Sequence, residues 1–284
     1  MTVHFRSMKY PESIKLLAID LDGTLLCKDL TFHSQIPLAF SATKANDLSI
    51  VIATGRSIQS ASHIVKPLNH EGHYVCANGC HVVDRDGNTL YQNHLNNDVK
   101  GTLIHFAQSR NLHITTYTPE GPCTLSNGRF LDQYKKLIQG LPVPIVSPEK
   151  IMNSEAHKIV FIAEPPRITL LRNEINSLLP KDQADMTESA PEYLEILPSG
   201  TNKSTGLNQL CLHLGITENA VAAIGDYRND YEMLNFVGFP VAIGNALREI
   251  KAIARHIVKP NSDGGVAQLI FEIIAHNQRM KCRQ

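Results

Sequence analysis

Short apolar runs alternate with amphipathic stretches in the first part of the chain. The apolar runs at 15–19, 48–53 and 73–77 indicate buried strands, and the stretches at 34–45 and 57–66 indicate helices. Strands that alternate with helices are typical of a parallel sheet with right-handed crossovers. This part of the chain therefore predicts an α/β fold.

The middle of the chain follows a different pattern. It comes after a hairpin pattern at 81–92, which turns at Asp86-Gly87 and ends the first part. The segments that follow are strands and helices in an α+β order, namely helices at 98–110, 129–139 and 168–179 and strands at 113–118, 122–126, 157–164, 184–189 and 193–199. We predict that this block is an inserted second domain at 87–190, between two parts of an α/β core at 1–86 and 191–284.

The α/β pattern returns after the insertion. The predicted elements are helices at 203–215, 230–237, 246–254 and 265–277 and strands at 220–225, 239–244 and 256–260. Both ends of the chain would then contribute to one parallel sheet.

Composition excludes several classes of protein. Of the 284 residues 43% are hydrophobic, and 27 basic residues balance 27 acidic ones, so no charge excess favours nucleic acid or an anionic membrane as a partner. No apolar run approaches the length of a membrane span, and Met1–Tyr10, which lacks a signal-peptide core, is expected to be a loose leader. Six scattered cysteines fit a reducing compartment, so we expect a cytoplasmic protein that is a monomer or a weak homo-oligomer.

Polar clusters follow three of the predicted strands. Asp20 and Asp22 follow the first strand, Thr54-Gly55-Arg56 follows the second, and Asp226 with Asn229 and Asp230 follows the strand at 220–225. Ligands of open parallel sheets bind beyond the carboxyl ends of the strands. The three clusters are therefore expected at one edge, which Lys203 could reach from the start of its helix.

These residue types suit one kind of chemistry. Residues at i and i+2 of an extended chain point to the same side, so Asp20 and Asp22 could face one site that Asp226 completes with a third carboxylate. Hard oxygen ligands suit Mg²⁺, and a carboxylate can attack phosphorus. Thr54 and a helix start can hold phosphate oxygens, and Lys203 offers a positive charge.

Each cluster also has an ordinary structural explanation. Asp22-Gly23 alone could be a turn that ends the strand, and Thr54-Gly55-Arg56 or the loop at 225–230 could serve only to cap a helix. Lys203 alone could be a solvated side chain. The occurrence of the three clusters and of Lys203 in this order favours the catalytic interpretation.

That order resembles the haloacid dehalogenase (HAD) superfamily, and within it the Cof-type phosphatases of subfamily IIB with a C2-type cap. The motifs that carry the resemblance are Asp20-Leu21-Asp22-Gly23-Thr24-Leu25, Ala53-Thr54-Gly55-Arg56, Lys203, Gly225-Asp226 with Asn229-Asp230, Asn78-Gly79 and Asp263-Gly264-Gly265-Val266. They extend from Leu16 to about Ile270. The resemblance implies a Rossmann-like core with an inserted α+β cap that closes over the site.

The resemblance also implies roles for single residues. Asp20 would be the nucleophile, and Asp22 would protonate the leaving oxygen and then activate water. Mg²⁺ would be bound by the carboxylates of Asp20 and Asp226 and by the backbone carbonyl of Asp22, with support from Asp230. The phosphoryl group would be held by Thr54, Gly55, Arg56, Lys203 and Asn229.

Two arginines leave alternatives open. Arg56 could contact the substrate or hold its own loop, and Arg228, which fills the middle of the fourth motif, could contact the substrate or face water. We expect the side chain of Arg228 to face water. Single histidines such as His113 and His157 are expected to be structural.

The resulting prediction is a Mg²⁺-dependent phosphatase of the HAD family that hydrolyses small phosphorylated metabolites through an aspartyl-phosphate. Sugar phosphates, phosphates of flavin precursors and pyridoxal phosphate are the substrate types considered. The alternatives are a phosphomutase or phosphotransferase that uses the same intermediate, and a non-enzymatic phosphoacceptor or binding protein.

Overall fold

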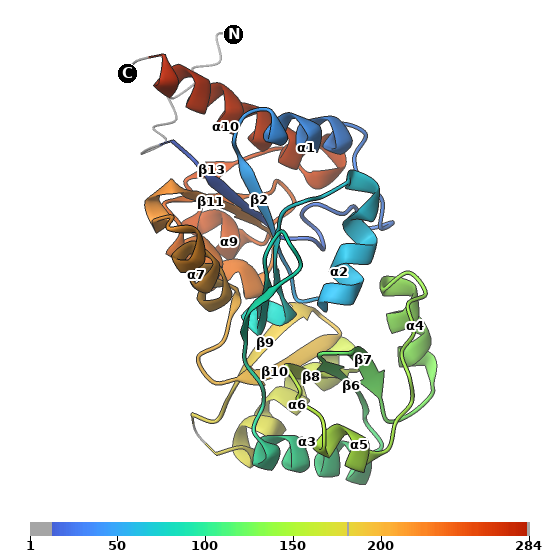
Figure 1. Ribbon diagram of the computed structural model, residues 1–284. Helices are drawn as coiled ribbons and strands as arrows, with labels where there is room; N and C mark the ends of the chain where they lie inside the picture. The colour runs from blue at the N-terminus through green and yellow to red at the C-terminus, as the bar shows by residue number, and fades with distance from the viewer. Residues whose placement is uncertain (1–12, 181, 283–284) are drawn as a thin grey trace. The chain divides into compact units, whose positions relative to one another are not determined.

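The computed structural model describes residues 13–180 and 182–282 (Figure 1). The predicted leader at Met1–Tyr10 lies outside these residues. The chain forms two compact units. The first unit consists of Met1–Val51 and Cys211–Gln284, as far as they are described, and the second of Ile52–Leu210.

The first unit contains parallel strands in the order β13-β12-β11-β1, with the start of β2 next to β1. The bounds are β1 Leu16–Ile19, β2 Ser49–Ala53, β11 Val221–Gly225, β12 Phe239–Ala242 and β13 His256–Ile257. Every residue of β1, β11 and β12 is buried. Burial of whole strands is expected where helices cover both faces of a parallel sheet, and it explains their unbroken apolar sequences.

Four α-helices lie in the described part of this unit, and a fifth ends in it. They are α1 Ile36–Lys44, α8 Tyr231–Phe236, α9 Arg248–Ile253 and α10 Gly265–Lys281, with α7 Lys203–Leu214 crossing from the second unit. Helices α1 and α10 pack side by side (Figure 1), and α8 and α9 pack against β12. The strand β13 has only two residues, which is shorter than the segment 256–260 predicted from the sequence.

The second unit begins with the end of β2 and continues the strand order as β2-β3-β4-β5. The bounds are α2 Ile58–Val65, β3 His73–Cys76, β4 His81–Val83 and β5 Thr89–Gln92. The hairpin predicted at 81–92 is confirmed, because β4 and β5 pair in antiparallel register. In its turn, Asp84 Oδ1 accepts hydrogen bonds from the backbone N–H groups of Asp86 and Asn88 at 2.9 and 2.8 Å.

A separate five-stranded antiparallel sheet, here called the cap sheet, has the order β7-β6-β8-β10-β9. Its strands are β6 His113–Thr118, β7 Gly121–Thr124, β8 Lys158–Ile162, β9 Ala184–Ala190 and β10 Tyr193–Pro198, and its helices are α3 Asn97–Ser109, α4 Arg129–Leu137, α5 Pro148–Met152 and α6 Pro165–Leu178. Helix α6 starts three residues before the predicted position because Pro165 and Pro166 fit the first turn of a helix. The short helix α5 was not predicted.

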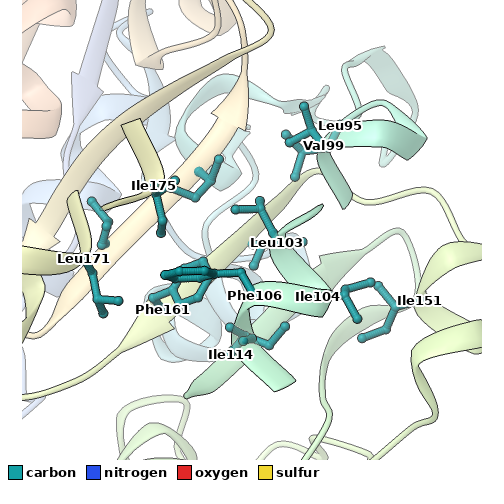
Figure 2. Packing of buried hydrophobic residues seen from close by; sticks show 14 of the residues in the cluster. Leu95, Val99, Leu103, Ile104, Phe106, Ile114, Ile151, Phe161, Leu171 and Ile175 are labelled. Atoms are coloured by element: carbon teal, nitrogen blue, oxygen red, sulfur yellow. The ribbon is translucent and has the colours of Figure 1, made fainter. Parts of the chain in front are cut away.

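The central strand β8 is buried on both faces. Ile159 and Phe161 lie in a cluster with α3 and α6, and Figure 2 shows Phe161 among these residues. Val160 and Ile162 lie in a second cluster with α4. This alternation follows from the two-residue period of a strand. The α/β fold with a separate α+β cap is confirmed, while the domain boundaries at 87 and 190 stay a prediction.

Candidate active site

Three carboxylates meet at the carboxyl ends of adjacent parallel strands in the first unit. Asp20 follows β1 and Asp226 follows β11, and the two strands run in register, with Asp20 N donating to Ile224 O at 3.0 Å. Together with Asp230 they each offer an oxygen, and these oxygens lie within 4.8 Å of one another. This is the only group of that kind among the described residues.

The loop after β1 is shaped around Asp226. Gly23 has a left-handed φ of +79°, and a Cβ at this position would lie 2.4 Å from Asp226 Oδ2. The neighbouring Thr24 is fully buried, and its hydroxyl donates to Asp226 Oδ1 at 3.2 Å. Asp22-Gly23 is therefore a turn, which is one of the two explanations that its sequence allows. The same turn places the backbone of Gly23 against the carboxylate of Asp226, a candidate metal ligand. The carboxylate of Asp22 is not part of the cluster of three.

The loop after β11 is held by Asp230. Its Oδ2 accepts hydrogen bonds from the backbone N–H groups of Asp226 and Tyr227 at 2.9 and 3.1 Å. A Cβ on Gly225 would lie 2.4 Å from the Asp230 carboxyl carbon, so only glycine admits this approach. Asn229 is also buried, at 7% exposure. Asp230 thus shapes the loop and also lies close enough to the other two acids to share an ion.

Arg228 extends from the same loop to Glu249. Its Nε lies 3.0 Å from Glu249 Oε1, and both side chains are about half exposed. The expectation that this arginine faces water agrees with that exposure.

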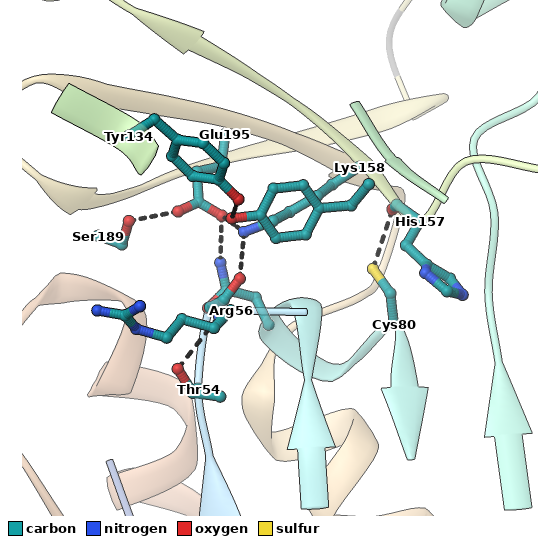
Figure 3. A network of polar contacts seen from close by, with 11 residues as sticks. Thr54, Arg56, Cys80, Tyr134, His157, Lys158, Ser189 and Glu195 are labelled. Atoms are coloured by element: carbon teal, nitrogen blue, oxygen red, sulfur yellow. Dashed lines mark hydrogen bonds and ion pairs between the residues drawn. The ribbon is translucent and has the colours of Figure 1, made fainter. Parts of the chain in front are cut away.

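The second predicted phosphate-binding segment lies in the second unit, after β2. Thr54 is fully buried and its backbone N–H donates to Val75 O at 2.8 Å, while Arg56 N donates to Thr54 Oγ1 at 3.1 Å. The next residue, Ser57, caps α2 by accepting from Ser60 N. Figure 3 shows Thr54 and Arg56 in the polar network that also includes Lys158 and Glu195 of the cap sheet.

Arg56 is buried, at 3% exposure. Its Nη1 donates to Leu137 O, at the end of α4, at 2.8 Å, and to Ser60 Oγ at 3.2 Å. A guanidinium near a helix C-terminus also complements the helix dipole. Arg56 therefore holds structure around its loop, and its predicted contact with phosphate stays a prediction.

The Asn78-Gly79 signature has a steric reason. Ala77, Asn78 and Gly79 all have positive φ values, of 50°, 53° and 97°. A Cβ on Gly79 would lie 2.0 Å from the backbone oxygen of Asn202. Asn202 also caps α7, because its Oδ1 accepts from Ser204 N at 2.9 Å. The close approach of Gly79 to Asn202 therefore helps to fix the first turn of α7, where the fully buried Lys203 lies.

Three stacked histidines form the other notable polar group of this unit. The ring of His157 stacks on those of His81 and His94, with centroids 5.0 and 4.9 Å apart. Burial, together with the neighbouring His81 and His94, lowers the pKa of His157 to about 3. Burial likewise lowers the pKa of His81 and His94, so the stack is neutral near pH 7 and acts as packing.

The predicted site residues are thus distributed over both units. The first unit carries Asp20, Asp22, Asp226, Asn229 and Asp230, and the second carries Thr54, Gly55, Arg56 and Lys203. The structure describes each group in detail, and their union in one site stays a prediction. Sequence reasoning missed the roles of Thr24 and Gly225 next to the acids.

Comparison with known proteins shows the family. Residues 17–270 match the haloacid dehalogenase-like hydrolase family, to which the chain therefore belongs. A provisionally named phosphatase of Streptococcus pyogenes is 32% identical over 264 residues, which cover 91% of this chain and 97% of that protein. The family predicted from the motifs is confirmed, and with it the assignment as a hydrolase.

Solved structures support the same conclusion. A provisionally described HAD/Cof-like hydrolase from Plasmodium vivax has a TM-score of 0.85 at 26% identity, covering 93% of this chain and 97% of its own. A haloacid dehalogenase-like hydrolase from Bacteroides thetaiotaomicron has a TM-score of 0.82 at 25% identity, covering 92% and 99%. The Cof-type prediction is confirmed as well.

Two further findings concern the helices and the cysteines. Within residues 13–180 and 182–282, none of the helices combines the length and the apolar character that a bilayer crossing requires. The six cysteines, all of them described, form no disulfide, and four of them are buried.

Proposed function

We propose that this protein is a Mg²⁺-dependent phosphatase that hydrolyses small phosphorylated metabolites through an aspartyl-phosphate on Asp20. The observation that carries the proposal is the cluster of Asp20, Asp226 and Asp230 at adjacent strand ends in a haloacid dehalogenase-like hydrolase. Glycines at 23 and 225 admit the close approaches that build this cluster.

The donor set fits a hard cation. Three carboxylates so close together repel one another, and all of their ligand atoms are oxygen, the type that Mg²⁺ prefers. We assign the ion to the carboxylates of Asp20 and Asp226 and the backbone carbonyl of Asp22, with Asp230 in support. When bound, the ion would neutralise negative charge on the phosphoryl oxygens.

The chain's own residues would then carry two transfers. A carboxylate oxygen of Asp20 attacks phosphorus, the bond from phosphorus to the ester oxygen breaks, and Asp22 gives that oxygen a proton. The deprotonated Asp22 next takes a proton from water, whose oxygen attacks phosphorus and releases Asp20 and inorganic phosphate.

The transferring group needs donors around it. We assign this role to Thr54, the Gly55 backbone and Lys203, with Arg56 and Asn229 as further contacts. Preorganised donors stabilise the charge of a phosphoryl transition state without reorganisation at the moment of reaction.

The inserted cap is the proposed determinant of substrate choice. A cap at 87–190 that closes over the site would exclude water and select the leaving group. The proposed substrates are a sugar phosphate, a flavin-precursor phosphate or pyridoxal phosphate in the cytoplasm, where free thiols such as those found here persist.

The test is phosphate release from a panel of these metabolites and from p-nitrophenyl phosphate, with and without Mg²⁺. Asp20→Asn removes the nucleophile, and Asp86→Asn is the control, because Asp86 is an exposed aspartate in the turn between β4 and β5 and is not part of the acidic cluster. We expect Mg²⁺-dependent release by the wild type and Asp86→Asn, and none by Asp20→Asn. Transfer of phosphate to an added sugar in place of release would favour the phosphotransferase alternative, and no reaction at all would contradict the proposal.

A further inference from the structure

Lys158 and Glu195 form a buried ion pair in the cap sheet, and the proposed chemistry does not use it. The side chain of Lys158 is 1% exposed and that of Glu195 is 3% exposed. The two residues are diagonal neighbours on one face of β8 and β10, because Glu195 pairs in register with Val160. Removing both charges from water is unfavourable, and an apolar pair in such a position is often at least as stable. The pair therefore calls for a role other than stability.

The ammonium of Lys158 contacts the predicted phosphate loop. Its Nζ donates to the backbone oxygen of Gly55 at 2.5 Å (Figure 3). The other two carbonyls of the loop are also engaged, because Thr54 O accepts from Asn78 N at 3.0 Å and Arg56 O accepts from Ala77 N at 2.8 Å. All three carbonyls of Thr54-Gly55-Arg56 are thus turned toward fixed donors.

The hydrogen-bond donors of the loop lie on the side opposite to its carbonyls. In a trans peptide the C=O and N–H groups point in opposite directions, so a Gly55 carbonyl directed at Lys158 sends Arg56 N–H the other way, to Thr54 Oγ1. Because that hydroxyl oxygen accepts this bond, its own proton is available for an anion. No described residue accepts the N–H of Gly55. An anion site needs donors facing inward and carbonyls facing away.

Glu195 holds the lysine in place. Its Oε2 accepts from Lys158 and, at 2.7 Å, from Asn78 Nδ2, and its Oε1 accepts from the Ser189 hydroxyl. On its other side Lys158 Nζ lies 4.3 Å from the ring centre of Tyr117. Burial is the main cause, and the neighbouring Tyr134 the second, of a pKa of Tyr117 well above its usual value. The phenol of Tyr117 therefore stays neutral and adds no negative charge to that of Glu195.

We propose that Lys158, held by Glu195, is a positioning residue for the phosphoryl group. It keeps the Gly55 carbonyl turned away from the anion and Arg56 N–H directed at Thr54 Oγ1, so that the proton of the Thr54 hydroxyl is presented to the anion. The Gly55 N–H is oriented by the preceding peptide, whose Thr54 carbonyl accepts from Asn78 N. This inference rests on the proposed function, in which the same loop binds phosphate. It adds that strands of the cap sheet, about a hundred residues later in the chain, set the geometry of that loop.

The test compares Lys158→Met with Lys100→Met. Lys100 is a matched control, because it is 3% exposed and its Nζ also donates to backbone carbonyls, those of Met152 and Ser154 at 3.1 and 2.6 Å, away from the loop. The measurements are kcat and KM for p-nitrophenyl phosphate with Mg²⁺, the dissociation constant of inorganic phosphate by calorimetry, and the thermal midpoint. If Lys158→Met does not fold, Lys158→Met/Glu195→Leu replaces it, because that pair leaves no buried charge.

We expect Lys158→Met to lower kcat/KM by about 100-fold, the loss typical of one misplaced transition-state donor, and to weaken phosphate binding by about tenfold. Lys100→Met should lower only the thermal midpoint. Equal kinetics and equal phosphate affinity of the two variants would overturn the inference. A wild type that binds phosphate but hydrolyses nothing would overturn the proposed function, and the phosphate affinity of Lys158→Met would still decide the inference. A wild type that does neither would overturn both.

Discussion

Gly23 and Gly87 offer a matched pair of substitutions for testing the acidic cluster. Both follow an aspartate in a turn, and both have left-handed φ values, of +79° and +85°. They differ in their surroundings. A Cβ on Gly23 would lie 2.4 Å from Asp226 Oδ2, whereas a Cβ on Gly87 would meet nothing within 4 Å. Substitution by alanine therefore separates the effect of backbone strain from displacement of the carboxylate.

The expected magnitudes follow from these contacts. Alanine in a left-handed conformation costs about 1–2 kcal/mol at either position, partly offset by about 0.4–1 kcal/mol from the less flexible unfolded chain. At Gly23 the carboxylate oxygen must also retreat by about 1 Å, from 2.4 Å to the 3.4 Å at which ordinary contact begins. A displacement of that size at a reacting centre lowers the rate by about 100-fold.

The assay is kcat/KM for p-nitrophenyl phosphate over a range of Mg²⁺ concentrations, with thermal midpoints measured in parallel. Both variants should melt a few degrees lower, at about 2–4 °C per kcal/mol for a chain of this size. Only Gly23→Ala should lose about 100-fold in kcat/KM and require more Mg²⁺ for half activation. If Gly23→Ala stays within a few-fold of Gly87→Ala, Asp226 does not act at the reacting centre and Asp22-Gly23 is only a turn.

Three further predictions follow from other parts of the molecule. Saturating Mg²⁺ should raise the thermal midpoint of the wild type, since a ligand at 100 times its Kd adds about 2.7 kcal/mol to the free energy of unfolding. The rise should be far smaller in Asp226→Asn, and the absence of any rise in the wild type would argue against a metal site. Phe161 is fully buried in the cluster that includes α3 and α6, so Phe161→Ala should reduce the free energy of unfolding in urea by about 3–5 kcal/mol. A loss below about 1 kcal/mol would contradict the packing shown in Figure 2. Burial lowers the pKa of His157 from 6.5 to about 3 in the folded state, so the unfolded chain takes up this proton first and the free energy of unfolding falls by up to about 1.4 kcal/mol per pH unit as the pH drops below 6.5. His157→Phe should show a shallower dependence between these pH values, and an unchanged slope would show that another group titrates.

Much of the candidate site could be predicted from the sequence because its logic is local. Apolar runs mark the strands, and acids directly after them mark the strand ends. Since parallel strands end at one edge of a sheet, Asp20 and Asp226 were expected to be neighbours although 206 positions separate them, and the pairing of β1 with β11 agrees. The motif order was also sufficient to predict the family.

Other features depended on contacts that no local pattern encodes. That Gly23 makes room for Asp226, and that Gly79 makes room for Asn202, follows only from the close approach of distant backbone segments. The strand pattern at 157–164 predicted β8 but not its neighbours. Lys158 came to face Gly55 and Glu195 because non-local antiparallel pairing placed β8 next to β10. Alternation along a strand determines which side chains share a face, whereas the partners of that face are decided by packing between segments far apart in the chain.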